Sequence, residues 1–342
     1  MPNIMINEAC NLRCPYCFAE EFVNHSPKEM TVEDFETAIN FAMSDREDRQ
    51  LGIIGGEPLF HSRLNEIMRI AVNDPRTEIV MIYTNAVELD RLAPEILESP
   101  KFRMLVNCNS PEDMGEAAFE KMVENMLRFK NEHSGGRRFR LSVNIYKPDF
   151  DFSYVIPLTN LLEFDVIRLS ISVPQKGDLG GLSPLEYFEQ MKPLAIKFVG
   201  TMIRCSVITG FDCNFVPNCV FTKEEREGML NAKDVLEKGM PIKYSQASWA
   251  RSIFCEINNC SPVIDILPDL RAIRCFGLSE HTKQDIRDFR DITELRNHYI
   301  STVDAPACRV WTEDRCAECW DREGGDCSCG CLLFKADQIF NK

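Results

Sequence analysis

Cysteine is the feature of this sequence that most restricts what the chain can form. The 342 residues include 16 cysteines. Residues 1–8 lack the basic and apolar segments of an export signal, so we expect the protein to stay in the cytoplasm. Structural disulfides are rare in that reducing compartment. The cysteines are therefore expected to serve as metal ligands or catalytic thiols rather than as disulfides.

The overall composition is that of an acidic globular protein. Hydrophobic residues make up 44% and charged residues 27%, and 39 basic against 53 acidic side chains give a net charge of -14. This charge argues against non-specific binding to nucleic acid or to an anionic membrane, since both require a positive surface. No apolar run approaches the roughly 20 residues of a membrane span. We therefore expect neither nucleic acid nor a membrane among the partners.

The cysteines divide the chain into regions. Three lie at positions 10, 14 and 17, only Cys108 follows before Cys205, and nine lie between Cys255 and Cys331. We expect a cysteine-poor body at 1–200, a bridging region at 201–244 and a cysteine-rich domain at 245–342.

Hydrophobic periodicity in the body alternates between the two regular structures. Short apolar runs predict strands at 4–7, 51–54, 79–84, 103–107, 140–145 and 166–173. Amphipathic stretches predict helices at 31–43, 63–72, 94–98, 117–133 and 184–199, and Thr31 is the expected cap of the first. Such alternation implies an α/β fold with a parallel sheet, either open or a partial barrel. Ligands in both collect at the carboxyl ends of the strands.

The first strand is followed by three closely spaced cysteines. Cys10, Cys14 and Cys17 have the spacing C-x3-C-x2-C. Three thiolates can hold one face of an iron–sulfur cluster and leave one iron open to a small molecule. Two alternatives are zinc, for which His25 is the only nearby fourth ligand, and buried thiols without a metal.

This loop resembles that of the radical S-adenosylmethionine (radical SAM) enzymes, with Tyr16 as the aromatic residue before the last cysteine. Gly55-Gly56-Glu57-Pro58 after the second strand is similar to the family's GGEP motif. The resemblance implies a partial (β/α)6 TIM-like barrel, a [4Fe–4S] cluster and S-adenosylmethionine as cofactors. It also implies that Gly55, Gly56 and Glu57 contact the methionine amino group.

Other strand ends resemble the family less specifically. Cofactor contacts are implied for polar groups that follow or lie in strands three to six, namely Thr84, Asn107, Asn109, Ser110, Asn144 and the backbone at Leu169. The alternative for each is an ordinary turn residue, because Asn and Ser are common in turns.

The C-terminal cysteines are consistent with zinc when taken alone, because C-x2-C pairs are typical of zinc ribbons. Together with the first loop they resemble the SPASM extension of radical SAM peptide maturases, which holds two auxiliary [4Fe–4S] clusters. The resemblance implies one cluster on Cys255, Cys260, Cys275 and Cys331, and a second on Cys316, Cys319 and Cys327. A one-cluster "twitch" version is the alternative.

The chain departs from the SPASM pattern at four points. Leu270 stands at the hairpin glycine, and seven residues rather than five follow Cys319 before the next cysteine of the pattern. No cysteine follows Cys331, so Cys308 or Cys329 is expected to complete the second cluster, or else one iron is open. Phe276 stands where sulfatase maturases carry Asp.

Four cysteines remain outside these sets. We expect Cys205 to be a small buried hydrophobe and Cys108 to face the mouth of the barrel. Cys213 and Cys219 are either buried thiols or proton or hydrogen-atom donors, with Asp212 as a further catalytic candidate. Glu8 and His61 are weaker acid–base candidates, because most charged side chains are simply solvated.

The resemblance predicts an enzyme that cleaves S-adenosylmethionine to a 5′-deoxyadenosyl radical and abstracts hydrogen from a ribosomally made peptide. The expected product is a thioether or carbon–carbon crosslink. Alternatives are a peptide epimerase, a sulfatase-maturase-like oxidase, a small-molecule dehydrogenase or cofactor-biosynthesis enzyme, and a zinc-binding scaffold. Because the first strand begins near residue 1, a separate leader-binding protein or the barrel itself is expected to bind the precursor peptide. A flavodoxin- or ferredoxin-type protein is the expected reductant.

Overall fold

The computed structural model describes most of the chain. The described residues are 1–45, 48–133, 138–173, 179–211, 216–222, 224, 225, 228, 260, 263–323, 327 and 330–340. Contacts divide the chain into two compact units, one of Met1–Arg140 with Pro262–Ala305 and the other of Leu141–Ser261 with Pro306–Lys342. The division of the sequence into domains at 1–200, 201–244 and 245–342 is a separate statement and stays a prediction.

The first unit is built on a sheet with the order β10-β9-β8-β1-β2-β3-β4. Its parallel strands are β1 (Asn3–Met5), β2 (Gln50–Ile54), β3 (Ile79–Thr84) and β4 (Phe102–Asn107). Ile4 pairs with Ile53, and Ile53 pairs with Ile82, so buried apolar residues lie side by side across the sheet. Because these strands are parallel and in chain order, their carboxyl ends meet at one edge.

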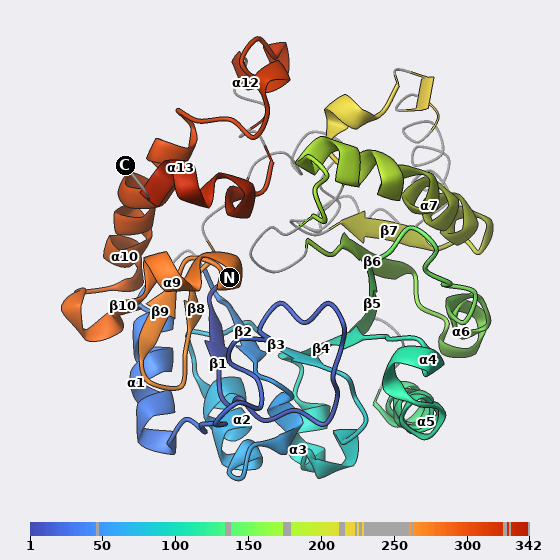
Figure 1. The fold of residues 1–342 in the computed structure, drawn as a ribbon. Helices are drawn as coiled ribbons and strands as arrows, with labels where there is room; N and C mark the ends of the chain where they lie inside the picture. The colour runs from blue at the N-terminus through green and yellow to red at the C-terminus, as the bar shows by residue number, and fades with distance from the viewer. Residues whose placement is uncertain are drawn as a thin grey trace. The chain divides into compact units, whose positions relative to one another are not determined.

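Four helices of this unit lie in the predicted places, namely α1 (Val32–Ala42), α2 (Leu64–Asn73), α3 (Pro94–Glu98) and α5 (Glu116–Glu132). The short helix α4 (Pro111–Met114), between β4 and α5, is one that the sequence pattern does not predict. Thr31 accepts a hydrogen bond from the Asp34 backbone and caps α1, as the sequence predicts. In Figure 1, α1, α2 and α3 lie together on one side of β1–β4.

A later segment returns to the edge of the same sheet. Strand β8 (Asp265–Ile266) pairs parallel with β1, and β9 (Arg271–Ile273) pairs antiparallel with β8, which confirms the predicted hairpin (Figure 1). Leu270 in its turn has φ +64°, a left-handed conformation that costs an L-residue roughly 1–2 kcal/mol. A glycine at this position would adopt the same conformation without that cost. The Leu270 side chain is buried, and this burial offsets the strain.

Short elements complete the first unit after the hairpin. They are η6 (Phe276–Leu278), α9 (Ser279–Thr282), β10 (Gln284–Asp285), η7 (Ile286–Asp288), α10 (Ile292–Tyr299) and the π-helix η8 (Ile300–Asp304). The Arg274 guanidinium, only 1% exposed, pairs with Asp304 at 2.8 Å and ties the hairpin to η8.

The second unit contains the remaining parallel strands and the C-terminal turns. Its strands are β5 (Phe139–Ile145), which belongs to this unit from Leu141 onward, β6 (Val166–Ile171) and β7 (Ile208–Phe211), and they pair in that order. Its main helices are α6 (Val155–Leu162) and α7 (Pro184–Arg204), and its short turns are η4 (Asn218–Val220), η9 (Asp314–Cys316), α12 (Trp320–Glu323), η10 (Leu332–Lys335) and α13 (Ala336–Phe340). Helix α11 (Ala305–Ala307) lies at the junction of the two units in the sequence.

The alternation of parallel strands with helices confirms the predicted α/β class and the partial (β/α)6 barrel. Those C-terminal cysteines that the structure describes lie among short irregular elements, also as predicted. No helix in the described part of the chain is both long and apolar enough to cross a bilayer.

We expect Asp304→Asn to lower the free energy of unfolding by about 3 kcal/mol, because it leaves the buried Arg274 charge without its partner. Glu95→Gln is the matched control, since the Arg69–Glu95 pair is half exposed and is expected to contribute little to stability. Urea unfolding of the two variants checks the contrast. If Asp304→Asn lowers the free energy of unfolding no more than Glu95→Gln does, the Arg274–Asp304 pair is not important for stability.

Candidate functional site

The cysteine loop begins directly after β1 in the first unit. Cys10, Cys14 and Cys17 are all partly buried, and the Cys17 backbone N–H donates to the Cys14 carbonyl at 3.1 Å. The backbone N–H of Leu12 donates to the Cys10 sulfur at 3.4 Å. Burial raises the pKa of Cys10 to about 11 and that of Cys14 to about 12. Without a cation the thiols therefore stay protonated, and metal binding must displace the protons.

The loop is attached to the end of β2 through the two glycines. The Gly56 N–H donates to the Asn7 carbonyl at 2.9 Å and the Glu57 N–H to the Ala9 carbonyl at 2.7 Å. A Cβ on Gly55 would lie 2.3 Å from the Asn7 side chain, and one on Gly56 would lie 2.5 Å from the Ala9 carbonyl. The glycines are thus required by the close approach of the cysteine loop itself.

The Glu57 carboxylate is buried and connects the ends of two strands. It accepts hydrogen bonds from the Thr84 hydroxyl at 2.6 Å, the Asn85 N–H at 2.7 Å and the Leu59 N–H at 3.2 Å. Burial raises its pKa to about 7, although these three donors act in the opposite direction. Glu57 and Thr84 are therefore brought together, and the carboxylate holds the floor of the site in place.

The end of β4 contacts the cysteine loop. The Asn109 amide donates to the Cys14 sulfur at 3.0 Å, and its oxygen accepts a hydrogen bond from the Tyr16 hydroxyl. Asn107 donates to the same hydroxyl at 3.2 Å. The structure thus brings three predicted site residues together around the cluster loop. Ser110 instead caps α4 by accepting from the Asp113 N–H at 3.1 Å.

Asn24 is a site residue that the sequence analysis missed. Its side chain accepts a hydrogen bond from the Cys10 N–H at 2.9 Å, and its backbone has φ +63°. Glu8, a weak acid–base candidate, accepts from the Lys28 N–H at 3.0 Å and is buried. The Asn24 N–H also donates to the Glu8 carbonyl, so both residues close the loop rather than react.

An aromatic group covers the C-terminal end of the loop. Phe276 contacts Phe18 and Phe22 edge to face, with ring centroids 4.9 and 5.7 Å apart. Cys17 packs against the same apolar cluster, which includes residues from β1, β2 and the hairpin. Phe276 therefore has a packing role at the position where sulfatase maturases carry an acid, and Cys275 comes immediately before it in the chain.

The remaining strand-end residues lie in the second unit. Asn144 of β5 pairs in register with Ser170 of β6, and Val143 pairs with Leu169. Paired residues of parallel strands lie on the same face, so Asn144 and Ser170 share one face of this sheet. Leu169 is fully buried.

The auxiliary cysteines divide between the units. Cys275 belongs to the first unit, whereas Cys260, Cys308 and Cys331 belong to the second. Cys316, Cys319 and Cys327 are half-buried in the second unit, where Cys219 also lies in η4. Four predicted site residues, Asp212, Cys213, Cys255 and Cys329, lie outside the described residues.

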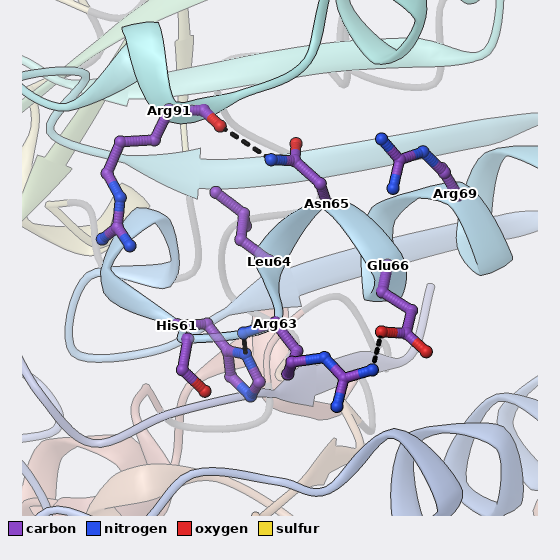
Figure 2. Close-up of a pocket in the computed structure, with 8 residues that line it drawn as sticks. His61, Arg63, Leu64, Asn65, Glu66, Arg69 and Arg91 are labelled. Carbon is purple, nitrogen blue, oxygen red and sulfur yellow. Dashed lines mark hydrogen bonds and ion pairs between the residues drawn. The ribbon is translucent and has the colours of Figure 1, made fainter.

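His61 borders a separate hollow of about 250 Å³ (Figure 2). Its ring accepts a hydrogen bond from the Arg63 N–H at 3.0 Å, and its other nitrogen lies 2.9 Å from the Met30 carbonyl. Burial lowers the pKa of His61. The ring therefore has a structural role. Ion pairs with Glu66 and Glu95 partly neutralise two of the three arginines of this hollow, Arg63 and Arg69.

Comparison with known proteins identifies the class of the site at the Cys10–Cys17 loop. Residues 4–146 match the model of the radical SAM superfamily. The protein carries a radical SAM domain. The resemblance carried by Cys10, Cys14, Cys17 and the Gly55–Gly56–Glu57 run is confirmed, and such domains use S-adenosylmethionine and a [4Fe–4S] cluster.

Curated relatives match over part of their length. The chain is 34% identical to GTP 3′,8-cyclase of Chlorobaculum tepidum over 96 residues, 28% of each chain. It is 31% identical to GTP 3′,8-cyclase of Listeria monocytogenes serovar 1/2a over 113 residues, 31% of this chain and 32% of that one. The aligned part thus spans about a third of these relatives or less.

Solved structures match over nearly the whole chain at low identity. SuiB of Streptococcus suis, bound to its precursor peptide SuiA, has a TM-score of 0.60 at 13% identity, covering 97% of this chain and 71% of SuiB. The enzyme anSMEcpe, with AdoMet and a peptide, has a TM-score of 0.57 at 14% identity, covering 99% and 98%. These likenesses establish the fold.

The residues of the radical SAM domain fit the cofactor. Two N–H donors, from Leu12 and Asn109, point at the cysteine sulfurs, as is common around metal-bound thiolates. No group of three or more Cys, His or acidic side chains among the described residues is already arranged to hold a metal ion. The three thiols of the loop are therefore expected to close around the metal when it binds.

We expect Gly56→Ala to displace the cysteine loop of the radical SAM domain, because its Cβ would lie 2.5 Å from the Ala9 carbonyl. The variant should lose about 1–3 kcal/mol of stability and most of the iron bound by the loop. Gly200→Ala is the control, since its Cβ in helix α7 meets only the end of Arg204 at 3.7 Å. Iron content and urea unfolding measure both. Full iron in Gly56→Ala would contradict the role of this close approach.

The buried Glu57 predicts a pH dependence of stability. A folded pKa of about 7 lies above the ordinary value of 4.5, so the stabilisation is complete below pH 4.5 and is lost as the pH rises through 7. Between pH 4.5 and pH 7, the free energy of unfolding of the wild type should fall by about 3 kcal/mol more than that of Glu57→Gln. Urea unfolding of the metal-free proteins at several pH values tests this. Parallel curves for the two proteins would contradict the raised pKa.

Proposed function

We propose that this protein is a radical SAM enzyme that modifies a ribosomally synthesised peptide, with a thioether or carbon–carbon crosslink as the product. The observation that carries the proposal is the fold match along nearly the whole chain. The match includes the cysteine-rich C-terminus and involves structures that contain bound peptides. The proposed partners are a precursor peptide, a separate leader-binding protein and a flavodoxin- or ferredoxin-type reductant.

In this proposal the chain's own residues position the reaction. Cys10, Cys14 and Cys17 hold the cluster, and the bound cluster and S-adenosylmethionine supply a 5′-deoxyadenosyl radical. The backbone around Gly55 and Gly56 would bind the methionine amino group. The Glu57 carboxylate, already bonded to Thr84 and Asn85, keeps that backbone in place.

Apolar residues near the cluster loop suit a reaction that must exclude water. Phe18 directly follows Cys17, and its side chain is 60% exposed although it contacts Phe276. An exposed aromatic side chain beside a cluster loop is a ready contact for an apolar group of a substrate. A peptide segment that covers Phe18 would shield the radical from solvent.

A second candidate is supported by the sequence relatives. GTP 3′,8-cyclases match this chain at about 30% identity, so a small-molecule substrate in cofactor biosynthesis is the runner-up. The matched portion covers about a third of those enzymes. The peptide proposal is preferred because the solved structures match nearly the whole chain.

We expect replacement of Cys10, Cys14 and Cys17 by Ala to abolish formation of 5′-deoxyadenosine from S-adenosylmethionine under reducing, anaerobic conditions. Each thiolate is a cluster ligand in the proposal, and the methyl side chain of alanine cannot bind iron. Chromatography of the nucleoside product measures the loss. Cys205→Ala is the control and should retain product formation. Persistence of the nucleoside in the triple variant would refute the role of the loop.

Mass spectrometry distinguishes the two substrate classes. A peptide encoded near the gene and co-expressed with the enzyme should lose two hydrogens per crosslink, whereas an epimer keeps its mass. A new product from GTP, with the peptide unchanged, would instead favour the second candidate, an enzyme of cofactor biosynthesis.

A further inference from the structure

One face of α7 holds a C-terminal segment of the second unit that contains the predicted second cluster. The Leu185 N–H donates to the Glu313 carboxylate at 2.7 Å, and Glu189, one turn later, pairs with Arg315 at 3.6 Å. Arg315 directly precedes Cys316. The helix therefore sets the position of the turn that carries the first cysteine of the C-x2-C pair.

The next turn of the same helix holds a segment from far earlier in the chain. Lys192 donates to the Val220 carbonyl at 3.2 Å and pairs with Glu225 at 3.1 Å. Val220 directly follows Cys219. Because Glu189 and Lys192 are three residues apart, they are neighbours on the helix surface. A single face of α7 thus brings Cys219 and Cys316 into the same region.

The cysteines also interact electrostatically. Cys219 lies close enough to Arg315 and to Cys327, Cys316 and Cys319 for their charges to interact with its thiolate. Cys10, Cys14 and Cys17 interact with one another in the same way. In the described structure Cys219 is exposed rather than buried, which does not fit a small core hydrophobe.

The C-x2-C pair itself has the turn geometry of a ligand pair. The Cys316 N–H donates to the Glu313 carbonyl at 2.9 Å and the Cys319 N–H to the Cys316 carbonyl at 3.4 Å. These successive turns place both thiols on one short stretch of chain. The predicted second cluster thus has three cysteine ligands, Cys316, Cys319 and Cys327. It needs a fourth.

We propose that Cys219 is the fourth ligand of the cluster held by Cys316, Cys319 and Cys327, in place of the missing cysteine beyond Cys331. The inference rests on the proposed auxiliary cluster and names a ligand from outside the C-terminal domain of the sequence. It replaces the role of Cys219 as a proton or hydrogen-atom donor. Four cysteine ligands leave no open iron, so this cluster transfers electrons and does not bind the substrate.

The test counts auxiliary metal alone. Full-length protein in which Cys10, Cys14 and Cys17 are Ala serves as the parent, and Cys219→Ala and Cys219→Ser are added to it. Cys205→Ala, a change in the same unit outside every proposed ligand set, is the matched control. After anaerobic reconstitution, iron and sulfide per chain are measured together with electron paramagnetic resonance. Titration of the metal-free protein with Co²⁺ reports the number of thiolate ligands through charge-transfer absorption.

Cys219→Ala is expected to bind less iron than the parent, to show a [3Fe–4S] signal after mild oxidation and to lose part of the cobalt–thiolate absorption. Cys205→Ala should match the parent. The proposal is overturned if Cys219→Ala also matches the parent, or if Cys308→Ala or Cys329→Ala produces the loss instead. Cys316→Ala is a further variant of the same parent. If its iron content equals that of the parent, the whole proposed ligand set is wrong. Formation of 5′-deoxyadenosine by the unmodified enzyme tests the radical function separately.

Discussion

The backbone hydrogen bonds between the cysteine loop and the end of β2 are the constraint on which the site depends. The loop has no helix or strand of its own at Cys10, Cys14 and Cys17. Its position comes from the N–H groups of Gly56 and Glu57, which donate to the residues between β1 and Cys10. Side chains at either glycine would occupy the space of the loop backbone. The glycine pair is therefore a packing requirement of the protein before it is a binding surface for a cofactor.

The buried carboxylate of Glu57 extends this constraint to the next strand. Its hydrogen bonds to Thr84 and Asn85 join the ends of β2 and β3. From β4, Asn107 and Asn109 contact Tyr16 and the Cys14 sulfur. Polar groups at successive strand ends thus converge on one loop, as expected where parallel strands end side by side. Three donors offset part of the cost of burying this carboxylate, and the part that remains keeps the pKa of Glu57 at about 7.

Much of the fold could be predicted because it follows from local periodicity. The strand at Ile79–Thr84 and the helix at Pro94–Glu98 lie as predicted, and the other matched elements of the body differ by a few residues at their ends. Thr31 caps its helix for the local reason the sequence shows. The cysteine spacing with Gly55, Gly56 and Glu57 could likewise identify the radical SAM domain, because these residues form short motifs.

The features that could not be predicted depend on contacts between distant segments. Asn24 reaches Cys10 because the loop folds back and Asn24 itself adopts a left-handed conformation. Phe276 packs on Phe18 because β8 pairs with β1 at the far edge of the sheet. No periodicity or spacing signals such long-range pairings. Cys219 is the strongest case, because neither its neighbours in sequence nor its spacing from Cys316 indicates a shared site.

The number of thiolates at each centre determines what that centre can do. A cluster on the Cys10–Cys17 loop has three cysteine ligands, which leaves one iron for a small molecule that chelates it. The proposed set in the second unit has four, and a closed coordination sphere suits electron transfer. The two sets are also built differently. The first is one short loop held by strand ends, whereas the second joins two distant segments along α7. A closed site of this kind forms only after α7 has folded, so its metal would stabilise the tertiary structure of the second unit.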